Sequence, residues 1–430
     1  MARAAVLPLL LLLLVLPHRS VESNSTDAHD ALISVFLPGA EDVGVFASLV
    51  TRHQIDLWRP ESLAQLGPGS SVQCLVGAEH TEVVLASLGN SSIPYNVTVS
   101  NVEEEVTKQA TQLQDMSANV ARGKVSYYDT YHPLDEIYRW MEEVAKHYSS
   151  WVSYKRIGVS HENRPLYVIK VGVRSSVAKP AVWIDCGIHA REWIAPAFCQ
   201  YFVQHAVNRL DRSMMELLKH FDFYVLPVLN VDGYHYSWTK SRLWRKNRAR
   251  SSHSACVGVD LNRNWNASWG GPGASADPCS QTFQGSRPES EPEVRAVAAF
   301  IRERRHRLHA YVTVHAYSQM LIFPYSYTEQ RSAHHEELEL VAQEVVQALR
   351  SVHGTPYRHG AGGPMLYMAA GGSDDWAHDL GIKYSFTFEL RDTGRYGFLL
   401  PANFIRATCQ ETMEAVKVIA LRAMHDPELA

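Results

Sequence analysis

The sequence predicts an α/β protein with a mixed, mostly parallel sheet sandwiched between helices, preceded by a small ferredoxin-like α+β domain. Three observations support this fold class. The charge balance of the chain changes near residue 122, short strand and helix signals alternate before that point, and longer apolar runs alternate with amphipathic patterns after it. Strands that are apolar throughout and separated by helices are typical of parallel sheets buried on both faces.

The leading part of the chain is acidic, and its strand and helix signals are short. Residues 24–122 carry 4 Lys and Arg against 12 Asp and Glu, whereas residues 123–430 carry 35 against 32. The strand and helix signals fall, in order, at strand 31–37, helix 43–51, strand 54–58, strand 71–76, helix 82–88 and strand 95–99. This order is that of a ferredoxin-like sandwich. The polar stretch 108–122 that follows indicates a weakly structured linker.

The larger part alternates buried strands and amphipathic helices. The strand-like runs are 181–185, 224–230, 310–315 and 385–390, and the helical patterns are 292–304, 335–352 and 404–423. Polar residues that carry reactive groups follow or end several of these strands. Open α/β sheets bind their ligands at such strand ends, so we expect a functional site there.

Composition and the first residues indicate an exported globular protein. The 430 residues are 46% hydrophobic and 20% charged, enough for the cores of about two domains. Arg3 and the apolar run from Ala4 to Leu16, with small residues near Ser20 and Ser23, predict a signal peptide over 1–23. That run is too short to span a bilayer. We expect neither a membrane nor a nucleic acid among the partners.

Two further features fit the extracellular space. Six cysteines in an exported chain favour disulfides. Four sequons match the N-glycosylation acceptor pattern, at Asn24, Asn90, Asn96 and Asn266.

The most informative motif is His189-Ala190-Arg191-Glu192, which lies between a strand-like run and a helical pattern. A His and a Glu three residues apart at such a junction can direct a nitrogen and a carboxylate at one Zn²⁺ ion. Catalytic zinc sites use three protein ligands and leave one position for water. His315 is the third candidate, although its position alone fits a hydrogen-bonded core histidine somewhat better. Asp260 is a natural hydrogen-bond partner for a ligating His.

Further motifs occur in a characteristic order along the chain. They are His189–Glu192, Arg242-Leu243-Trp244-Arg245, Asn262-Arg263-Asn264-Trp265, His315–Ser318, Leu366-Tyr367 with Gly371-Gly372-Ser373, and Phe386–Asp392. In this order they resemble the zinc metallocarboxypeptidases of the A/B type, and the resemblance covers the whole chain. Residues 236–238 with 244–248, and residues 335–338, look most like the plasma members of the B type. The resemblance implies one zinc ion held by His189, Glu192 and His315.

The same resemblance implies a role for each remaining site residue. Glu389 would be the general base, and Arg245 would stabilise the oxyanion of the tetrahedral intermediate. The terminal carboxylate and the adjoining substrate would be bound by Arg191, Asn262, Arg263, Tyr317 and Tyr367. Arginine suits a carboxylate because its planar guanidinium pairs with both oxygens.

One position bears on the substrate. In Gly372-Ser373-Asp374-Asp375-Trp376, the resemblance aligns Asp375 with an Asp shared by A-type and B-type enzymes. Asp374 aligns with an apolar residue of A-type enzymes and an Asp of B-type enzymes. A carboxylate at the floor of the pocket would attract Arg or Lys and would leave an unpaired charge beside an apolar terminus. In isolation, the same residues also fit a solvated Gly-rich turn.

The resemblance also covers cysteines and processing. It suggests disulfides between Cys186 and Cys199 and between Cys256 and Cys279, which leaves Cys74 and Cys409 as free thiols. Residues 24–122 would be a pro-segment and residues 123–430 the catalytic domain. The exposed basic site after Arg122 would be cut by a trypsin-like protease, thrombin or plasmin by resemblance.

The sequence therefore predicts a secreted zymogen that, once cut, releases C-terminal Arg or Lys. Resemblance to the plasma members implies removal of C-terminal lysines from fibrin and slower fibrinolysis. Two alternatives remain: an A-type enzyme that prefers apolar termini, and a catalytically silent secreted binding protein. Asp374 argues against the first. The intact set of His189, Glu192, His315, Arg245 and Glu389 argues against the second.

Overall fold

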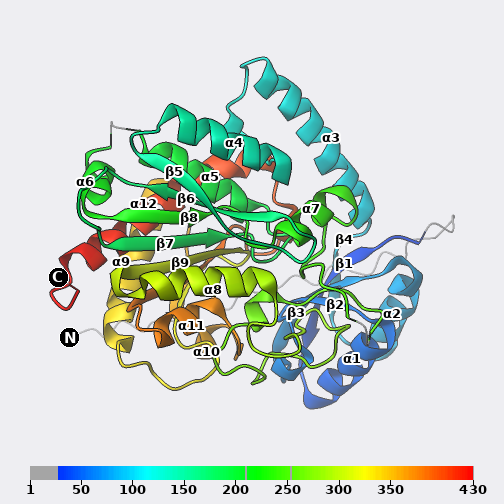
Figure 1. The fold of residues 1–430 in the computed structure, drawn as a ribbon. Coiled ribbons are helices and arrows are strands. Elements are labelled where there is room, and N and C mark those ends of the chain that lie inside the picture. The colour runs from blue at the N-terminus through cyan, green and yellow to red at the C-terminus, as the bar shows by residue number, and fades with distance from the viewer. Residues whose placement is uncertain (1–27, 209–210, 252–253, 430) are drawn as a thin grey trace, which may run out of the picture.

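The computed structural model describes residues 28–208, 211–251 and 254–429, which form a small leading domain and a larger α/β domain (Figure 1). The predicted signal peptide and the Asn24 sequon lie outside the described residues. None of the described helices combines the length and the apolar character needed to cross a bilayer.

The leading domain is a four-stranded antiparallel sheet with strand order β2-β3-β1-β4. Its elements are β1 Ala31–Leu37, α1 Ala40–His53, β2 Asp56–Arg59, β3 Ser70–Val76, α2 Ala78–Asn90 and β4 Tyr95–Val99. Side chains alternate along β1. Ile33 and Val35 enter the small core with Phe46 of α1, whereas Leu32 joins the core of the larger domain. The ferredoxin-like prediction is confirmed.

The predicted linker over 108–122 is wrong, because residues Val102–Ala121 form the 20-residue helix α3. The Asn101 side chain accepts a hydrogen bond from the backbone N–H of Glu104 and caps this helix. Its apolar stripe is narrow: Val102 and Leu113 are buried in the core of the larger domain and most of the remaining surface is polar. Because so few positions are apolar, the sequence shows no clear helical periodicity there, and the helix was not predicted. Arg122 follows the helix and is exposed.

The larger domain contains an eight-stranded mixed sheet with order β11-β10-β12-β9-β7-β8-β6-β5. The central strands β12, β9, β7 and β8 pair in parallel. The strands are β5 Val152–Val159, β6 Pro165–Val171, β7 Ala181–Cys186, β8 Asp222–Leu226, β9 Leu308–Ala316, β10 Met320–Phe323, β11 Arg358–Ala361 and β12 Tyr384–Leu390. The predicted mixed, mostly parallel sheet is confirmed.

Helices cover both faces of this sheet, with α8 in front of it and α12 behind it in the view of Figure 1. The helices are α4 Leu134–His147, α5 Ile194–Ala206, α6 Arg212–His220, α7 Val231–Thr239, α8 Pro292–Arg304, α9 His335–His353, α10 Gly362–Met365, α11 Ser373–Asp379 and α12 Ile405–His425. Every residue of β7, β8 and β9 is buried. This explains why these strands lack polar alternation in the sequence.

Candidate active site

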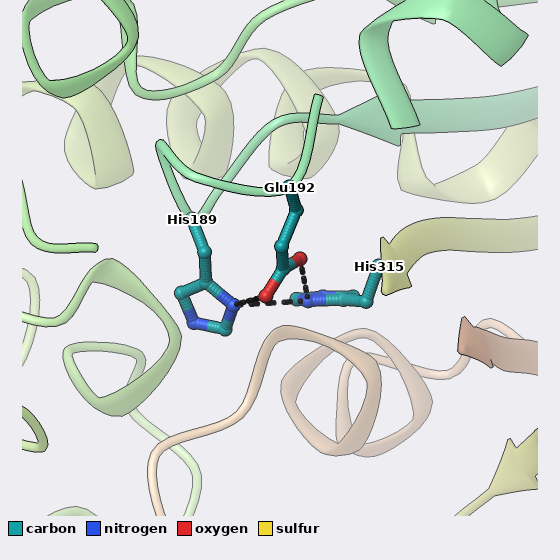
Figure 2. A group of neighbouring side chains, drawn as sticks. All are labelled: His189, Glu192 and His315. Atoms are coloured by element: carbon teal, nitrogen blue, oxygen red, sulfur yellow. Dashed lines mark hydrogen bonds and ion pairs between the residues drawn. The ribbon is translucent and has the colours of Figure 1, made fainter. Parts of the chain in front are cut away.

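Three acid or imidazole side chains converge where β7 and β9 end (Figure 2). His189 and Glu192 lie in the turn between β7 and α5, and His315 is the penultimate residue of β9. The turn starts at Gly187, whose φ is +66°, and a Cβ there would lie 3.0 Å from the Pro196 ring. A side chain at this position would therefore strain the turn that presents both ligands.

The donor atoms of the three side chains are close enough to share one ion. His189 Nδ1 lies 2.7 Å from Glu192 Oε1, and His315 Nδ1 lies 3.2 Å from Glu192 Oε2 and 3.2 Å from His189 Nδ1. All three side chains are buried. Two imidazole nitrogens facing each other across a carboxylate form a His-Glu-His set that suits zinc.

Two hydrogen-bond chains orient the imidazole rings. Asp260 Oδ1 lies 3.2 Å from His189 Nε2, as predicted. Thr313 Oγ1 lies 3.2 Å from His315 Nε2 and donates a 2.8 Å hydrogen bond to Asp185. Partners of this kind fix which ring nitrogen faces the metal. The sequence reasoning missed Asp185 and Thr313, although a buried Asp in an apolar strand beside the metal motif was a usable signal.

The parallel register of the sheet brings Glu389 beside the metal site. Glu389 of β12 is paired with His315 of β9, and its side chain lines the same cavity as His189 and His315. Burial, together with the charges of Glu192 and Glu61, raises the pKa of Glu389. Arg391 forms an ion pair with Glu411 instead of Glu389. The Glu389 carboxylate is therefore free of the arginine two residues away.

The same cavity collects most of the predicted substrate-binding residues. Its lining includes Asn262, Arg263, Tyr367 and Asp374, together with Glu389 and the two imidazoles. Tyr317 lines an adjoining hollow with Tyr367 and Glu389. Arg245 is fixed by Asp260, whose Oδ2 lies 2.9 Å from Nη2. Arg191 points elsewhere, toward Asp56 of the leading domain, 2.7 Å from its Nη1.

The two neighbouring aspartates of α11 have different surroundings. Asp375 accepts hydrogen bonds of 2.9 Å from the backbone N–H groups of Ser326 and Tyr327, so it fixes a loop. Burial and the adjacent Asp374 charge raise the pKa of Asp375. Asp374 is also buried, with 4% of its surface exposed, and it lines the cavity. Of these two aspartates, Asp374 lines the cavity and Asp375 does not.

Comparison with known proteins agrees with this site. The zinc carboxypeptidase family model matches residues 137–415, and the carboxypeptidase activation peptide model matches residues 33–109. The chain belongs to the zinc carboxypeptidase family. His189, Glu192 and His315 are its zinc-binding triad, and the chain is a zymogen with its activation peptide in place.

The relatives include B-type carboxypeptidases and a carboxypeptidase A6 of Mus musculus. Carboxypeptidase B2 of Bos taurus is 49% identical over 385 residues, covering 89% of this chain and 90% of its own length. Carboxypeptidase B of Homo sapiens is 46% identical over 391 residues, covering 90% and 92%. A crystal structure of thrombin activatable fibrinolysis inhibitor has a TM-score of 0.87 and 46% identity, covering 93% of this chain and 100% of its own.

The activation peptide reaches into the active site of this zinc carboxypeptidase. Glu61 pairs with Arg245 and Arg263, and Gln73 accepts a hydrogen bond from the Tyr317 hydroxyl. Burial raises the pKa of Glu61, but the guanidinium groups of Arg245 and Arg263 outweigh it and lower the pKa to about 2. Sequence reasoning missed Glu61, because only the acidic surplus of the leading domain pointed to such a contact.

The cysteines follow the prediction. Cys186 is bonded to Cys199 and Cys256 to Cys279, whereas Cys74 and Cys409 are buried free thiols. The first disulfide joins the end of β7 to α5, on both sides of the turn that carries His189 and Glu192. It therefore restrains that turn.

Proposed function

We propose that this chain is the secreted precursor of a B-type zinc carboxypeptidase that releases Arg or Lys from the C-termini of peptides. The observation that carries the proposal is the buried Asp374 in the cavity that also contains His189, His315 and Glu389. A desolvated carboxylate favours a cationic side chain and disfavours an apolar one, which would leave its charge unpaired.

The proposed reaction assigns separate roles to zinc, Glu389 and Arg245. Zinc, when bound, lowers the pKa of a water ligand to about 7 and polarises the scissile carbonyl. Glu389 accepts the proton from the attacking water and delivers it to the leaving amine. Arg245, whose guanidinium is fixed by Asp260, faces the negative charge that develops on the carbonyl oxygen.

The terminal carboxylate of the substrate would be held by Arg263, with Asn262 and Tyr367 beside it. The contact of Glu61 with Arg245 and Arg263 supports this assignment, because a carboxylate already occupies both guanidinium groups in the precursor. Such a grip restricts cleavage to the last residue of a chain, since an internal peptide bond has no carboxylate at that position.

Release of the activation peptide would follow a cut after Arg122 by a trypsin-like protease, which separates residues 24–122 from residues 123–430. The exposure of residues 121–124 at the end of α3 supports this cut. Thrombin and plasmin are candidate activating proteases, and the relative known as thrombin activatable fibrinolysis inhibitor supports thrombin.

The likeness to thrombin activatable fibrinolysis inhibitor also supports a narrower proposal: a plasma enzyme that removes C-terminal lysines from fibrin and slows fibrinolysis.

Export is supported by the two disulfides. Glycosylation at Asn90, Asn96 and Asn266 is supported by the exposure of all three side chains.

A peptide panel tests the proposal. The precursor, before and after trypsin treatment, is given peptides that differ only in a terminal Arg, Lys, Phe or Glu, with and without a zinc chelator. We expect chelator-sensitive release of Arg and Lys after cleavage. Preferred release of Phe would favour an A-type enzyme, and no release from any peptide would favour a silent binding protein.

A further inference from the structure

The activation peptide and the catalytic domain enclose a hollow that is separate from the cavity of the zinc triad. Its volume is about 240 Å³, which exceeds the roughly 150 Å³ of an engineered apolar cavity that binds benzene. Side chains from β1, β2, β4 and α3 of the activation peptide form one wall, and side chains between residues 395 and 401 of the catalytic domain form the other. The complete hollow therefore exists only while the two domains are docked.

Hydrogen bonds between the domains lie on two sides of this hollow. Gln73 Nε2 donates a 2.8 Å hydrogen bond to the Gly394 carbonyl, and Gln109 Nε2 donates one of 3.4 Å to the Leu400 carbonyl. Between these two points of contact, Arg395 and Tyr396 line the hollow instead of touching the opposite wall closely. The hollow is thus framed by the docked interface.

The two walls are mostly apolar. Trp58 and Val102 of the activation peptide are buried in the core that the two domains share, and Val99, Tyr396 and Leu399 pack against that core. All five side chains also line the hollow, so part of their apolar surface meets no protein atom there. A ligand with an apolar body would cover this surface on both sides at once.

The charge that lines the hollow is positive. Lys108 forms ion pairs with Glu104 and Glu105, at 2.7 Å and 2.9 Å, so the charges of Glu105 and Lys108 offset each other. Arg395 has no hydrogen bond or ion pair with any residue that the structure describes, and its guanidinium lies 5.2 Å from the centre of the Tyr396 ring. A carboxylate complements this cation, because the planar guanidinium can pair with both of its oxygens.

We propose that the hollow binds a small amphipathic carboxylate of the fatty-acid type, with its apolar tail between the two walls and its carboxylate at Arg395. The ligand binds the docked precursor and not the separated domains, so it favours the docked state by mass action. The proposal concerns the contact between the domains and is independent of the terminal residue that the enzyme releases.

The binding test uses octanoate as the probe and calorimetry as the measurement. Octanoate should bind the intact precursor and should not bind the trypsin-activated enzyme after the activation peptide has been removed. Octanol, which has the tail without the charge, should bind the precursor about two- to fivefold more weakly, the scale of one exposed ion pair. Acetate should not bind. Equal binding of octanoate to the precursor and the activated enzyme, or no binding to either, would overturn the proposal.

Two variants of the precursor locate the ligand. Val99→Phe places a ring in the hollow and should abolish octanoate binding. Arg395→Gln, at an exposed position that tolerates substitution, should weaken octanoate two- to fivefold and leave octanol unchanged. Arg350→Gln is the matched control, because Arg350 is exposed on α9 and does not line the hollow. If Arg395→Gln binds octanoate as tightly as Arg350→Gln does, the carboxylate contact is refuted, whatever Val99→Phe shows.

A second measurement tests the effect on docking without using enzyme activity. The precursor is cut by trypsin, the trypsin is inhibited, and gel filtration measures how much of the activation peptide has separated from the catalytic domain. With octanoate at ten times its Kd, the equilibrium constant for separation should fall by about tenfold. An unchanged constant would show that the ligand does not act at the interface.

Discussion

The Glu61 carboxylate of the activation peptide forms two hydrogen bonds with Arg245 of the catalytic domain, of 2.7 Å to Nη1 and 2.9 Å to Nη2. Arg245 is the residue to which we assign the oxyanion, so a carboxylate of the zymogen occupies the place where negative charge would develop. Glu61 also bonds to Arg263, at 2.9 Å. One side chain therefore occupies two cations to which we assign roles in the reaction.

The first prediction concerns this contact. Glu61→Gln removes the charge but keeps the shape, so the activation peptide should hold the site less tightly. We expect the uncut variant to cleave a small Arg-terminated substrate faster than the uncut parent protein. Glu82→Gln is the control, because Glu82 is exposed on α2. If both precursors are equally inactive on small substrates, Glu61 does not maintain latency.

The second prediction follows from the lowered pKa of Glu61, which is about 2 in the docked state against 4.5 for a free Glu. A carboxyl group with a lowered pKa contributes its full stabilisation above about pH 4.5 and loses it as the pH falls toward 2. Docking of the activation peptide should therefore weaken over this interval. Hydrogen exchange near Trp58 would measure it. In Glu61→Gln, docking should not weaken through this group as the pH falls. An identical acid response in the two proteins would show that Glu61 is not the titrating group.

Much of the site could be predicted from the sequence, because its motifs resemble those of a known family and its residues lie at the ends of buried strands. His315 and Glu389 occupy paired positions of neighbouring parallel strands, and His189 follows a third. Strand order and parallel pairing therefore place them together once each strand is recognised. The sheet was recognisable because its central strands are apolar throughout.

Contacts between the two domains were not predictable in this way. Glu61 lies in a loop and Asp56 in an edge strand. Nothing in the sequence around either residue indicates a partner more than one hundred residues away. Helix α3 was missed for a related reason. Its buried face consists of few residues that pack on the other domain, so the helix is amphipathic only in the context of that domain.

The third prediction tests specificity. Asp374→Ile removes the buried carboxylate, so kcat/KM for peptides ending in Arg should fall by about ten- to a hundredfold, since a hydrogen bond to a charged group contributes roughly 1.5–3 kcal/mol. Activity on peptides ending in Phe should rise. Asp379→Asn, at an exposed position of the same helix, serves as the control. An unchanged ratio between Arg and Phe would show that Asp374 is not the floor of the pocket.

The fourth prediction tests the general base. Glu389→Gln should retain zinc, because His189, Glu192 and His315 are unchanged, but turnover should fall by about a hundred- to ten-thousandfold, the usual contribution of a positioned base. Zinc content measured by metal analysis separates loss of the base from loss of the metal. A variant that keeps its zinc and nearly normal turnover would remove Glu389 from the mechanism.

The fifth prediction concerns activation. Residues 121–124 are exposed where α3 ends, and a protease needs such an accessible segment. Trypsin or thrombin should yield a catalytic domain that begins at Gly123, with a large gain in activity. In Arg122→Gln, this product should disappear, and trypsin should cut after Lys124 instead, giving a product that begins at Val125. The double variant Arg122→Gln/Lys124→Gln should stay uncut between residues 121 and 125 and should remain latent.

N-terminal sequencing decides between these outcomes: a Gly123 product from Arg122→Gln would contradict the assigned bond. Full activity of the uncut double variant would instead show that cleavage is not what activates the enzyme.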